Sequence, residues 1–492
     1  MFGNQIAGNI SAKGKKTFQS FDPKNNCPNT SYFFVATEEE IDLALTQSSN
    51  SFYSFCSGSP AERAFLLEQI AEQLIELRSE ISQAYCKESG LSLSRFDTEF
   101  KRTVDQLLLF ASYLENSKVD FISETPANLE SSLPHLVKKN IPLGPVLVFG
   151  ASNFPLAYST IGGDTVSAFA AGCPVVVKAH PFHPETSFLV GKAIKSAIDN
   201  TNFPQGIFSQ LFDDHFDVGQ KLALDNRIKA IGFTGSYTGG KALFDLANSR
   251  QIPIPVFAEM GSINPVFIFP ESLKNQSEFW AQHFAKSISN DAGQFCTKPG
   301  LFFIPNTENG KLFISILKDK LVQEHSYTML HPTIYKRYEI KKEQLRNLSN
   351  GEFIEKKGSL SQLEGRQGLL TIDKDEFFQI EQLKEEVFGP FAILCFYDSL
   401  DELLAYTKEL QGQLTSTIIA TQEEIINNES VIFNIKQLAG RIIFNGVPTG
   451  VRVCESMQHG GPFPASTDAR FTAVGTDSML RFMRPIVYQD NC

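Results

Sequence analysis

The segment VLVFGASNFPLAYSTIGGDTVSAFAAGCPVVVK, residues 146–178, decides the fold of this chain. Two short apolar runs, Val146–Phe149 and Val175–Lys178, enclose a stretch with helical spacing at Leu156–Ala171. A strand, a helix and a second strand in this order predict a βαβ unit with parallel strands. Because ligands of parallel sheets bind beyond the carboxyl ends of the strands, the loops after Phe149 and Lys178 are the first candidates for a site.

The same alternation of strand and helix patterns extends in both directions along the chain. Further strands are predicted at Ile207–Leu211, Ala230–Phe233 and Val256–Glu259, with helices at Glu185–Ile198, Val218–Leu224 and Thr238–Asn248. After Pro265 a second alternating region has strands at Val266–Phe269 and Leu301–Ile304 and helices at Phe279–Ser289 and Gly310–Val322. We therefore expect an α/β fold with two doubly wound domains.

The N-terminal part has a different texture. Apolar residues at helical spacing predict one amphipathic helix over Ala61–Ser89 that ends at Gly90, and a second over Glu99–Leu114. The polar segment Glu124–Ile141 interrupts this helical region, so we expect an arm or an edge strand there.

Composition excludes several classes of protein. The net charge of −11 argues against a nucleic-acid or anionic-membrane partner. The eight cysteines form no CxxC pair, which favours free thiols over a zinc site or a disulfide framework, and we expect no metal. The N-terminus shows no secretory signal and no apolar run has the length of a bilayer span, so a cytoplasmic protein is expected.

Two residues suggest nucleophilic chemistry. Cys296 follows Gly293-Gln294-Phe295 between a predicted helix and a predicted strand, where it is either an inert buried thiol or a nucleophile. Glu259 ends an apolar strand, where partial desolvation would raise its pKa and suit it to act as a base. The alternative for Glu259 is a helix cap or a surface ion pair.

Three further loops carry polar groups beside predicted strand ends. Asn153 in Gly150–Pro155 is either a turn residue or an amide donor to a developing oxyanion. The run Gly232-Phe233-Thr234-Gly235-Ser236 closes a strand and opens a helix, which suits a pyrophosphate, although it is not a complete GxGxxG motif. Lys178 is placed to reach ribose hydroxyls or to be a solvated strand end.

Together and in this order, these motifs resemble the aldehyde dehydrogenase superfamily over nearly the whole chain. The resemblance rests on Asn153-Phe154-Pro155, Lys178, Gly232–Ser236, Glu259-Met260-Gly261, Gly293–Cys296 and Glu385-Glu386-Val387-Phe388-Gly389-Pro390. It implies a dinucleotide-binding domain at 1–121 and 142–259 and a catalytic domain at 260–455. It also implies an oligomerisation arm at 122–141 and 470–492, and a homodimer or homotetramer.

The resemblance also implies a role for each motif. Cys296 would attack the aldehyde as nucleophile, with Asn153 and the Cys296 N–H as the oxyanion hole. The thiohemiacetal would pass a hydride to the nicotinamide, and Glu259 would activate the water that hydrolyses the thioester. The cofactor would be held by Lys178 and Glu386 at the riboses, by Phe388 near the nicotinamide ribose, and by Gly235 and Ser236 at the pyrophosphate.

Other stretches resemble one branch of this superfamily, which contains 2,5-dioxopentanoate (α-ketoglutarate semialdehyde) dehydrogenases and bacterial NADP-dependent fatty-aldehyde dehydrogenases. Those stretches are Lys178–Pro184, Gln294–Gly300 and Phe444–Val451. Arg102 and Gln106 lie four apart on a predicted helix, so they share a face. If that face lines the substrate tunnel, they hold a substrate carboxylate, which favours the dioxo acid; Arg452 is a second candidate. The alternative for both arginines is a surface charge.

The expected cofactor is NADP, with NAD as the alternative. NAD-preferring relatives carry an acid three residues after the lysine, and this chain has Pro181 there, so repulsion of a 2′-phosphate is removed. The arginine of the NADP-preferring branch is replaced by Phe216, which leaves His180 and His183 as candidate phosphate contacts. Two rival functions are a CoA-acylating or acyl-phosphate-reducing enzyme of the same fold, and a catalytically silent binding relative.

Overall fold

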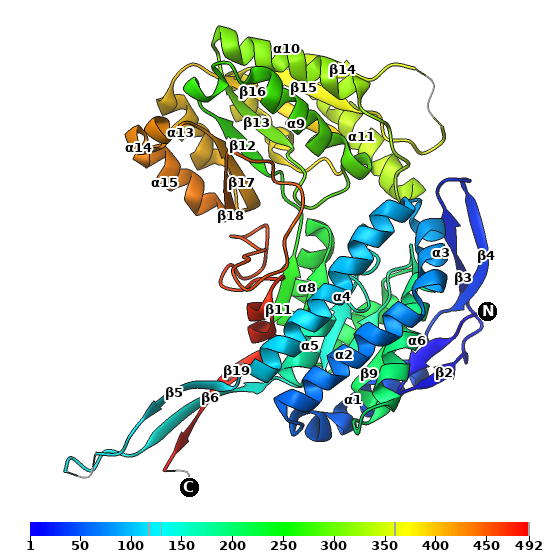
Figure 1. Ribbon diagram of the computed structural model, residues 1–492. Coiled ribbons are helices and arrows are strands. Elements are labelled where there is room, and N and C mark those ends of the chain that lie inside the picture. The colour runs from blue at the N-terminus through cyan, green and yellow to red at the C-terminus, as the bar shows by residue number, and fades with distance from the viewer. Residues whose placement is uncertain (117–118, 129, 359–360, 491–492) are drawn as a thin grey trace.

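A computed structural model describes residues 1–116, 119–128, 130–358 and 361–490. It contains two seven-stranded sheets, each flanked by helices, and a three-stranded sheet that projects from one end of the molecule (Figure 1). This confirms the predicted α/β class with two doubly wound domains and a small β arm. Cys492 and its neighbour, the end of the predicted arm, lie outside the described residues.

The first sheet brings together the ends of the strands that the βαβ pattern predicted. Its order is β11 (Val256–Glu259), β10 (Ala230–Thr234), β7 (Val146–Phe149), β8 (Val175–Lys178), β9 (Phe208–Leu211), β1 (Asn4–Ile6) and β2 (Asn9–Ser11). The strands from β11 to β9 are parallel, and Phe149 pairs with Lys178 and Lys178 with Leu211. The carboxyl ends therefore align, and the loops that follow them meet at one edge.

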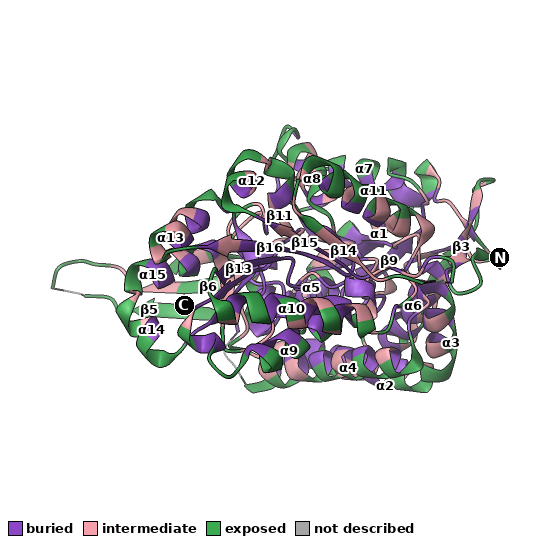
Figure 2. Cartoon of the chain, turned by 90° about the horizontal axis from the view of Figure 1, so that it is seen from above, coloured by how far each residue is buried: buried purple, intermediate pink, exposed green. Residues whose placement is uncertain are grey.

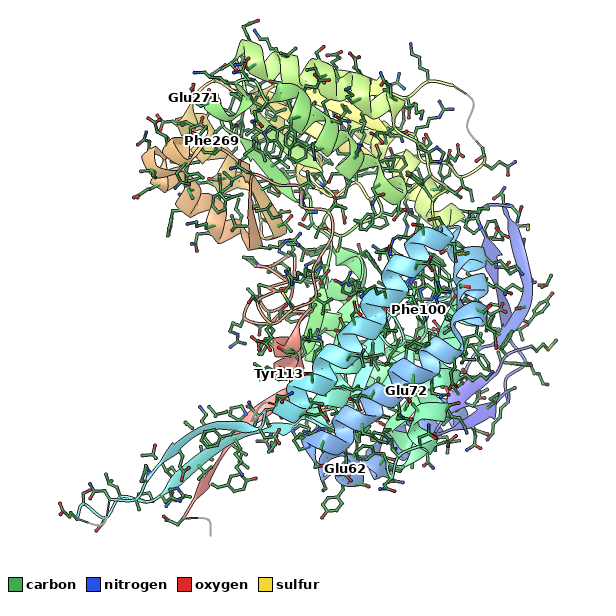
Figure 3. The ribbon with its side chains drawn as sticks, in the orientation of Figure 1. Glu62, Glu72, Phe100, Tyr113, Phe269 and Glu271 are labelled. Atoms are coloured by element: carbon green, nitrogen blue, oxygen red, sulfur yellow. The ribbon has the colours of Figure 1, made fainter. Side chains whose placement is uncertain are left out.

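Helices cover this sheet. They are α1 (Glu38–Cys56), α2 (Pro60–Glu76), α3 (Arg78–Ser89), α4 (Leu93–Asn116), α5 (Gly163–Ala171), α6 (Pro184–Asp199), α7 (Asp217–Leu224) and α8 (Tyr237–Asn248). The exposed face of α2 carries charged side chains such as Glu62 and Glu72 (Figure 3). Phe100 on α4 lies in the core, and burial of its apolar ring stabilises the fold.

Two helix predictions were wrong in extent. The single helix predicted over 61–89 is broken at Leu77, although Gly90 does end α3 in the left-handed conformation, at φ 69°. Apolar residues keep helical spacing across the break, so the spacing could not reveal it. The helix predicted from Leu156 begins only at Gly163, because the Glu99 carboxylate accepts the N–H groups of Leu156 and Ala157 and holds a turn there.

The second sheet has its own core and its own covering helices. Its order is β14 (Glu352–Glu355), β15 (Gly368–Ile372), β16 (Phe391–Tyr397), β13 (Leu301–Pro305), β12 (Pro265–Ile268), β17 (Gln413–Ile419) and β18 (Ala439–Phe444). The helices are α9 (Ser277–Ser289), α10 (Glu308–Gln323), α11 (Pro332–Leu348), α12 (Lys374–Gln379), α13 (Leu400–Glu409), α14 (Gln422–Asn427) and α15 (Glu429–Leu438). The central strands are buried throughout (Figure 2).

The projecting sheet is built from two distant parts of the chain. β19 (Met483–Gln489) pairs antiparallel with β6 (Leu136–Pro142), which pairs with β5 (Phe121–Thr125). The hairpin β3 (Thr17–Asp22) and β4 (Cys27–Phe34) lies apart, near the N-terminus (Figure 1). The boundaries predicted for the three domains, and a role of the projecting sheet in oligomerisation, stay predictions.

Of the helices in the part of the chain that the structure describes, none has the length and apolarity to cross a membrane. The seven cysteines in that part are free thiols. The expectations of a cytoplasmic location and of a homodimer or homotetramer stay predictions.

Candidate active site

Cys296 follows an unusual piece of backbone. After α9, Asp291, Ala292 and Gly293 all have positive φ, at 45°, 56° and 63°. Such a conformation costs roughly 1–3 kcal/mol for a residue other than glycine, so the surrounding contacts must hold it. At Gly293 an added Cβ would lie 2.4 Å from the Gly389 carbonyl oxygen, so a side chain has no room there. The loop before Cys296 is therefore constrained by its own backbone conformation and by its contact with Gly389.

Cys296 and Glu259, predicted as nucleophile and base, meet at a third residue. His459 Nε2 lies 3.6 Å from Cys296 Sγ and 3.1 Å from Glu259 Oε1. The histidine has no exposed surface and Glu259 is 4% exposed. The backbone of His459 is fixed by Thr472, whose hydroxyl accepts its N–H, and by Ala473, whose N–H donates to its carbonyl. One imidazole nitrogen thus connects the sulfur with the carboxylate.

The pKa of Glu259 corrects the expectation from the sequence. Burial raises it, as predicted, but the neighbouring His459 opposes burial by charge and contact, and the pKa falls below 4.5. The pKa of Cys296 moves the other way, well above 9, because of burial and the Glu259 charge. In this geometry the thiol keeps its proton, so loss of that proton requires an acceptor beside it.

His459 was missing from the residues predicted from the sequence. It lies 163 residues from Cys296 in the chain, inside the segment 446–464, which is rich in Gly and Pro. The two glycines that follow His459, Gly460 and Gly461, were the available sign of a closely packed backbone. Gly461 leaves no space for a Cβ, which would lie 2.0 Å from the Gln413 carbonyl oxygen. The segment is a closely packed wall of the site.

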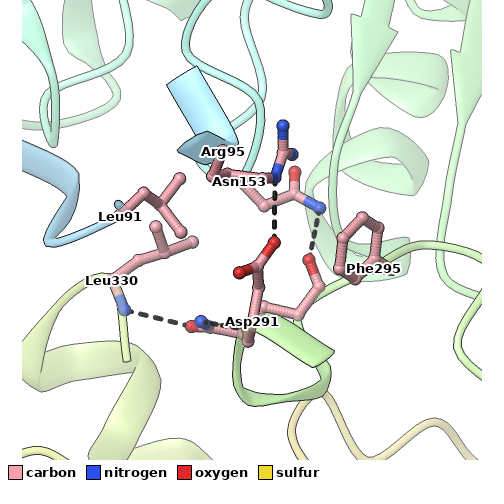
Figure 4. Close-up of a pocket in the computed structure, with 7 residues that line it drawn as sticks. Leu91, Arg95, Asn153, Asp291, Phe295 and Leu330 are labelled. Atoms are coloured by element: carbon pink, nitrogen blue, oxygen red, sulfur yellow. Dashed lines mark hydrogen bonds and ion pairs between the residues drawn. The ribbon is translucent and has the colours of Figure 1, made fainter. Parts of the chain in front are cut away.

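Asn153 lies beside the Cys296 loop. Its Nδ2 donates to the Gln294 carbonyl at 2.9 Å (Figure 4). Phe154 and Phe295 stack edge to face, with ring centroids 5.6 Å apart, so the two loops also share an apolar contact. The amide has a second N–H, which remains for a substrate oxygen.

The loop that carries Cys296 is held from below by Asn264. Its side-chain amide donates to the carbonyls of Cys296, at 2.8 Å, and Lys298, at 3.0 Å. Ser262 and Thr415 donate to the Asn264 oxygen. These residues also escaped the sequence analysis, since buried amides that bind backbone leave no pattern in a sequence.

The three residues predicted to bind substrate have different positions. Arg102 donates to the Tyr158 hydroxyl at 2.8 Å, and Tyr158 lies next to His459, with ring centroids 6.2 Å apart. Gln106 is 3% exposed on the same helix. Arg452 is exposed, and within the described residues no hydrogen bond or ion pair joins it to the site.

A different arginine of the second domain faces the site. Arg441 on β18 and Arg102 on α4 both lower the pKa of Cys296 by their charge, against burial. Arg441 donates to the carbonyls of Pro448 and Gly450, and its Nε is buried without an acceptor. Arg441 thus lies near Cys296, and the substrate-binding roles predicted for Arg102, Gln106 and Arg452 stay predictions.

The cluster also has donor atoms that metals bind. Atoms of Glu259, Cys296 and His459 lie within 4.8 Å of one another. However, His459 Nδ1 is buried without a hydrogen-bond partner among the described residues. A metal-bound histidine almost always donates its other ring nitrogen to a partner. We therefore interpret the cluster as a proton-transfer arrangement.

Comparisons with known proteins identify the family of this chain. Residues 10–332 match the model of the aldehyde dehydrogenase family. An alpha-ketoglutaric semialdehyde dehydrogenase of Acinetobacter baylyi is 39% identical, and the alignment covers 99% of this chain and 93% of the relative. The chain belongs to the aldehyde dehydrogenase family.

Two other comparisons agree with this aldehyde dehydrogenase assignment. Alpha-ketoglutaric semialdehyde dehydrogenase 2 of Azospirillum brasilense is 37% identical over 99% of this chain and 94% of its own. A structure of betaine aldehyde dehydrogenase from Staphylococcus aureus in complex with NAD+ has a TM-score of 0.85 at 17% identity. It covers 100% of this chain and 97% of its own, and it supports the fold. The enzyme is an oxidoreductase that acts on aldehydes with a nicotinamide cofactor.

The residues expected at the adenosine end of that cofactor lie around the end of β8. The Lys178 ammonium is buried and donates to the Asp213 carbonyl at 2.8 Å, so it is not a solvated strand end. Burial lowers the pKa of Lys178 to about 8. The pKa of His180 is held well below 6.5 by burial and by His183 and Lys178, so its imidazole is neutral.

Gly235 and Ser236 begin helix α8 as predicted. The Ser236 hydroxyl accepts the Gly239 N–H and caps the helix. An added Cβ at Gly235 would meet the Phe233 ring at 2.7 Å, so this glycine also makes room for an aromatic side chain. The N–H groups of this helix start point to the strand-end edge, which suits an anion.

Glu386 and Phe388 lie in the loop that constrains Gly293. A Cβ at Gly261 would meet Glu386 Oε2 at 2.3 Å, so the carboxylate packs against bare backbone. Burial raises the pKa of Glu386 to about 7, and the charge of Lys298 opposes this shift. Within the described residues Glu386 makes no hydrogen bond, which leaves its oxygens for ribose hydroxyls. The residues present thus fit a dinucleotide.

Replacing His459 tests its effect on Glu259. In a His459→Ala enzyme, only Cys296 and Arg481 still oppose the effect of burial on the Glu259 carboxyl, so its pKa rises and the acid limb of the kcat–pH profile moves to higher pH. We expect kcat at pH 7 to fall roughly hundredfold, the lower limit of the range for general acid–base residues. The exposed His283→Ala is the control; an unshifted profile with kcat within twofold of the unaltered enzyme would contradict the interpretation.

Proposed function

We propose that this enzyme oxidises 2,5-dioxopentanoate (α-ketoglutarate semialdehyde) to 2-oxoglutarate. One observation carries the catalytic part of the proposal: the partly buried Cys296 Sγ lies beside the buried His459 Nε2 and Glu259 Oε1, next to the Asn153 loop. Relatives 37–39% identical over nearly the whole chain carry this substrate in their names, and they support the substrate.

The first half of the reaction uses the sulfur and the oxyanion donors. The thiol proton passes to the His459–Glu259 pair as Cys296 attacks the carbonyl carbon and forms a thiohemiacetal. Asn153 and the Cys296 N–H donate to the oxygen where charge develops. A bound nicotinamide would supply the hydride acceptor, and loss of the hydride from the thiohemiacetal carbon would leave a thioester on the Cys296 sulfur.

The second half needs water and a base. Glu259 ends β11 in carboxylate form, because His459 keeps its pKa low. It accepts a proton from water as the water attacks the thioester carbon. The carbon–sulfur bond then breaks and the acid departs; the Cys296 sulfur takes back the proton that the His459–Glu259 pair received from it, and the proton from water passes to solvent. A CoA-acylating or acyl-phosphate-reducing enzyme has no need of this base, so the cluster favours hydrolysis. The intact cluster also argues against a catalytically silent relative.

Buried donors without acceptors support an acidic substrate. Arg102 Nε, Gln106 Nε2 and Arg441 Nε are all buried without a hydrogen-bond partner among the described residues. An unpaired buried donor costs about 1–3 kcal/mol, more when it is charged. A carboxylate and a keto oxygen satisfy such donors, whereas the hydrocarbon tail of a fatty aldehyde cannot. The fatty-aldehyde alternative therefore has less support.

Variants of Cys296 and Glu259 test the two halves of the reaction separately. We expect Cys296→Ala to abolish aldehyde-dependent NAD(P)H formation. Glu259→Gln keeps the sulfur, so it should give close to one NAD(P)H per active site rapidly and then turn over at least a hundredfold more slowly. Stopped-flow absorbance at 340 nm measures both phases. Steady turnover by Cys296→Ala would refute the proposed nucleophile.

Substrate charge is tested with two arginine variants. Arg102→Ala and Arg441→Ala should each raise KM for 2,5-dioxopentanoate at least tenfold, since each removes a charged donor. The KM for pentanal, which has the same carbon number without the acid, should change less than threefold. Arg452→Ala, at an exposed arginine, is the matched control. Equal effects on both aldehydes would contradict carboxylate binding.

The enzyme accepts NADP in this proposal, and NAD is the alternative cofactor. Pro181 offers no carboxylate to repel a 2′-phosphate, while the neutral His180 offers it no charge. We therefore expect kcat/KM values for NADP and NAD within about tenfold of each other. Initial rates with each cofactor decide this, and no measurable rate with NADP would contradict it.

A further inference from the structure

A buried network of charges lies behind the loops of Cys296 and Asn153, outside the reacting atoms. It consists of Glu99 and Arg95 on α4 and Asp291 in the loop before Cys296. The Glu99 side chain is fully buried, and those of Arg95 and Asp291 are 12% and 14% exposed. Figure 4 shows Arg95, Asp291, Asn153 and Phe295 around one small pocket.

Glu99 holds the loop that carries Asn153. One carboxylate oxygen accepts the N–H groups of Leu156 and Ala157, each at 2.9 Å. The other oxygen accepts the Tyr85 hydroxyl at 2.6 Å and Arg95 Nη1 at 3.0 Å. The carboxylate thus has four donors and fixes the turn directly after Asn153-Phe154-Pro155.

Arg95 extends from this carboxylate to the other domain. Its Nε donates to Asp291 Oδ2 at 2.9 Å. Its guanidinium lies 4.4 Å from the centre of the Phe154 ring and 5.5 Å from that of Phe295. These rings flank Asn153 and Cys296 in sequence, so one planar cation contacts both loops through charge and through stacking.

Asp291 is the first of the three residues with positive φ. A positive φ still costs an aspartate free energy, and the ion pair of its side chain with Arg95 helps to hold the conformation. We propose that Glu99, Arg95 and Asp291 act as a positioning network that sets the distance between the Cys296 sulfur and the Asn153 amide. The inference rests on the roles proposed for Cys296 and Asn153.

The network explains how two loops from different domains keep one geometry. Asn153 follows a strand of the first sheet and Cys296 precedes a strand of the second. Among the described residues, the direct polar contact between the two loops is the hydrogen bond from the Asn153 amide to the Gln294 carbonyl, and the Gln294 side chain in turn accepts the Leu330 N–H. A displacement of about 1 Å between reacting groups costs roughly a hundredfold in rate, so a rigid tie has a direct effect on turnover.

The test removes the tie at Asp291. We expect Asp291→Ala to lower kcat by roughly a hundredfold while KM for aldehyde and cofactor stays within threefold. Asp291→Asn keeps an oxygen for Arg95 Nε and should recover kcat to within about tenfold of the unaltered enzyme. A second readout needs neither aldehyde nor cofactor: the rate at which iodoacetamide alkylates Cys296, followed by peptide mass spectrometry, should change at least tenfold in Asp291→Ala.

Asp225→Ala is the matched control. Asp225 also pairs with an arginine, Arg227, but that pair precedes β10 at the amino ends of the strands, opposite the site. It should leave kcat and the alkylation rate within twofold. If Asp291→Ala does not fold, Arg95→Lys carries the test, because a lysine keeps the charge without bridging Glu99 and Asp291; kcat should fall at least tenfold.

Three results would overturn the proposed positioning role of the network. These are unchanged kcat and alkylation in Asp291→Ala, an Asp291→Asn enzyme as slow as Asp291→Ala, and an unaffected Arg95→Lys enzyme. Failure of the proposed function is recognised separately, because it appears as activity in Cys296→Ala. The alkylation readout remains valid whichever aldehyde is the substrate.

Discussion

Contact of one buried imidazole with both a thiol and a carboxylate is the constraint on which the site depends. His459 Nε2 lies 3.6 Å from Cys296 Sγ and 3.1 Å from Glu259 Oε1, with no exposed surface on the histidine. Burial and the Glu259 charge raise the pKa of the Cys296 thiol, and contact with His459 lowers the pKa of Glu259, so the protonation of each group depends on its neighbour. The site is therefore a coupled set, in which the sulfur becomes reactive only when its proton has somewhere to go.

The arrangement of the two sheets brings these groups together. Glu259 ends a strand of the first sheet, Cys296 lies in the loop before β13 of the second, and His459 lies in a segment that returns after β18. The turn after β7 supplies Asn153, held against the Cys296 loop by hydrogen bonding and by paired rings. Aldehyde chemistry between two domains requires this convergence, and it also leaves the strand-end edge of the first sheet for a dinucleotide.

Sequence reasoning was most successful where local pattern determines structure. The strands from Val146 to Glu259 were predicted almost residue by residue, because buried parallel strands are short apolar runs bounded by turns. The predictions of one helix over 61–89 and of a helix from Leu156 were wrong. The start of α5 at Gly163 depends on a tertiary contact, the Glu99 carboxylate that accepts N–H groups 57 and 58 residues away, and the break at Leu77 leaves the helical spacing of the apolar residues intact.

The site was predicted in part. Cys296, Glu259 and Asn153 belong to motifs with recognisable neighbours, whereas His459 and Arg441 contribute through single side chains with none. The predicted direction of the Glu259 pKa shift was wrong because desolvation can be inferred from an apolar strand, whereas contact with His459, 200 residues away, cannot. Arg452 was chosen in place of Arg441 because nothing in the sequence shows which arginine of that region points inward.

The central claim is that carbon–sulfur chemistry at Cys296 joins these groups in one reaction. Acid quenching of the enzyme during turnover with aldehyde and NADP, followed by proteolysis and mass spectrometry, measures it most directly. We expect the peptide that contains Cys296 to carry the acyl group of the substrate, up to one per chain, and the other cysteine peptides to carry none. Turnover without any acyl group on Cys296, or with the acyl group on another cysteine, would contradict the claim.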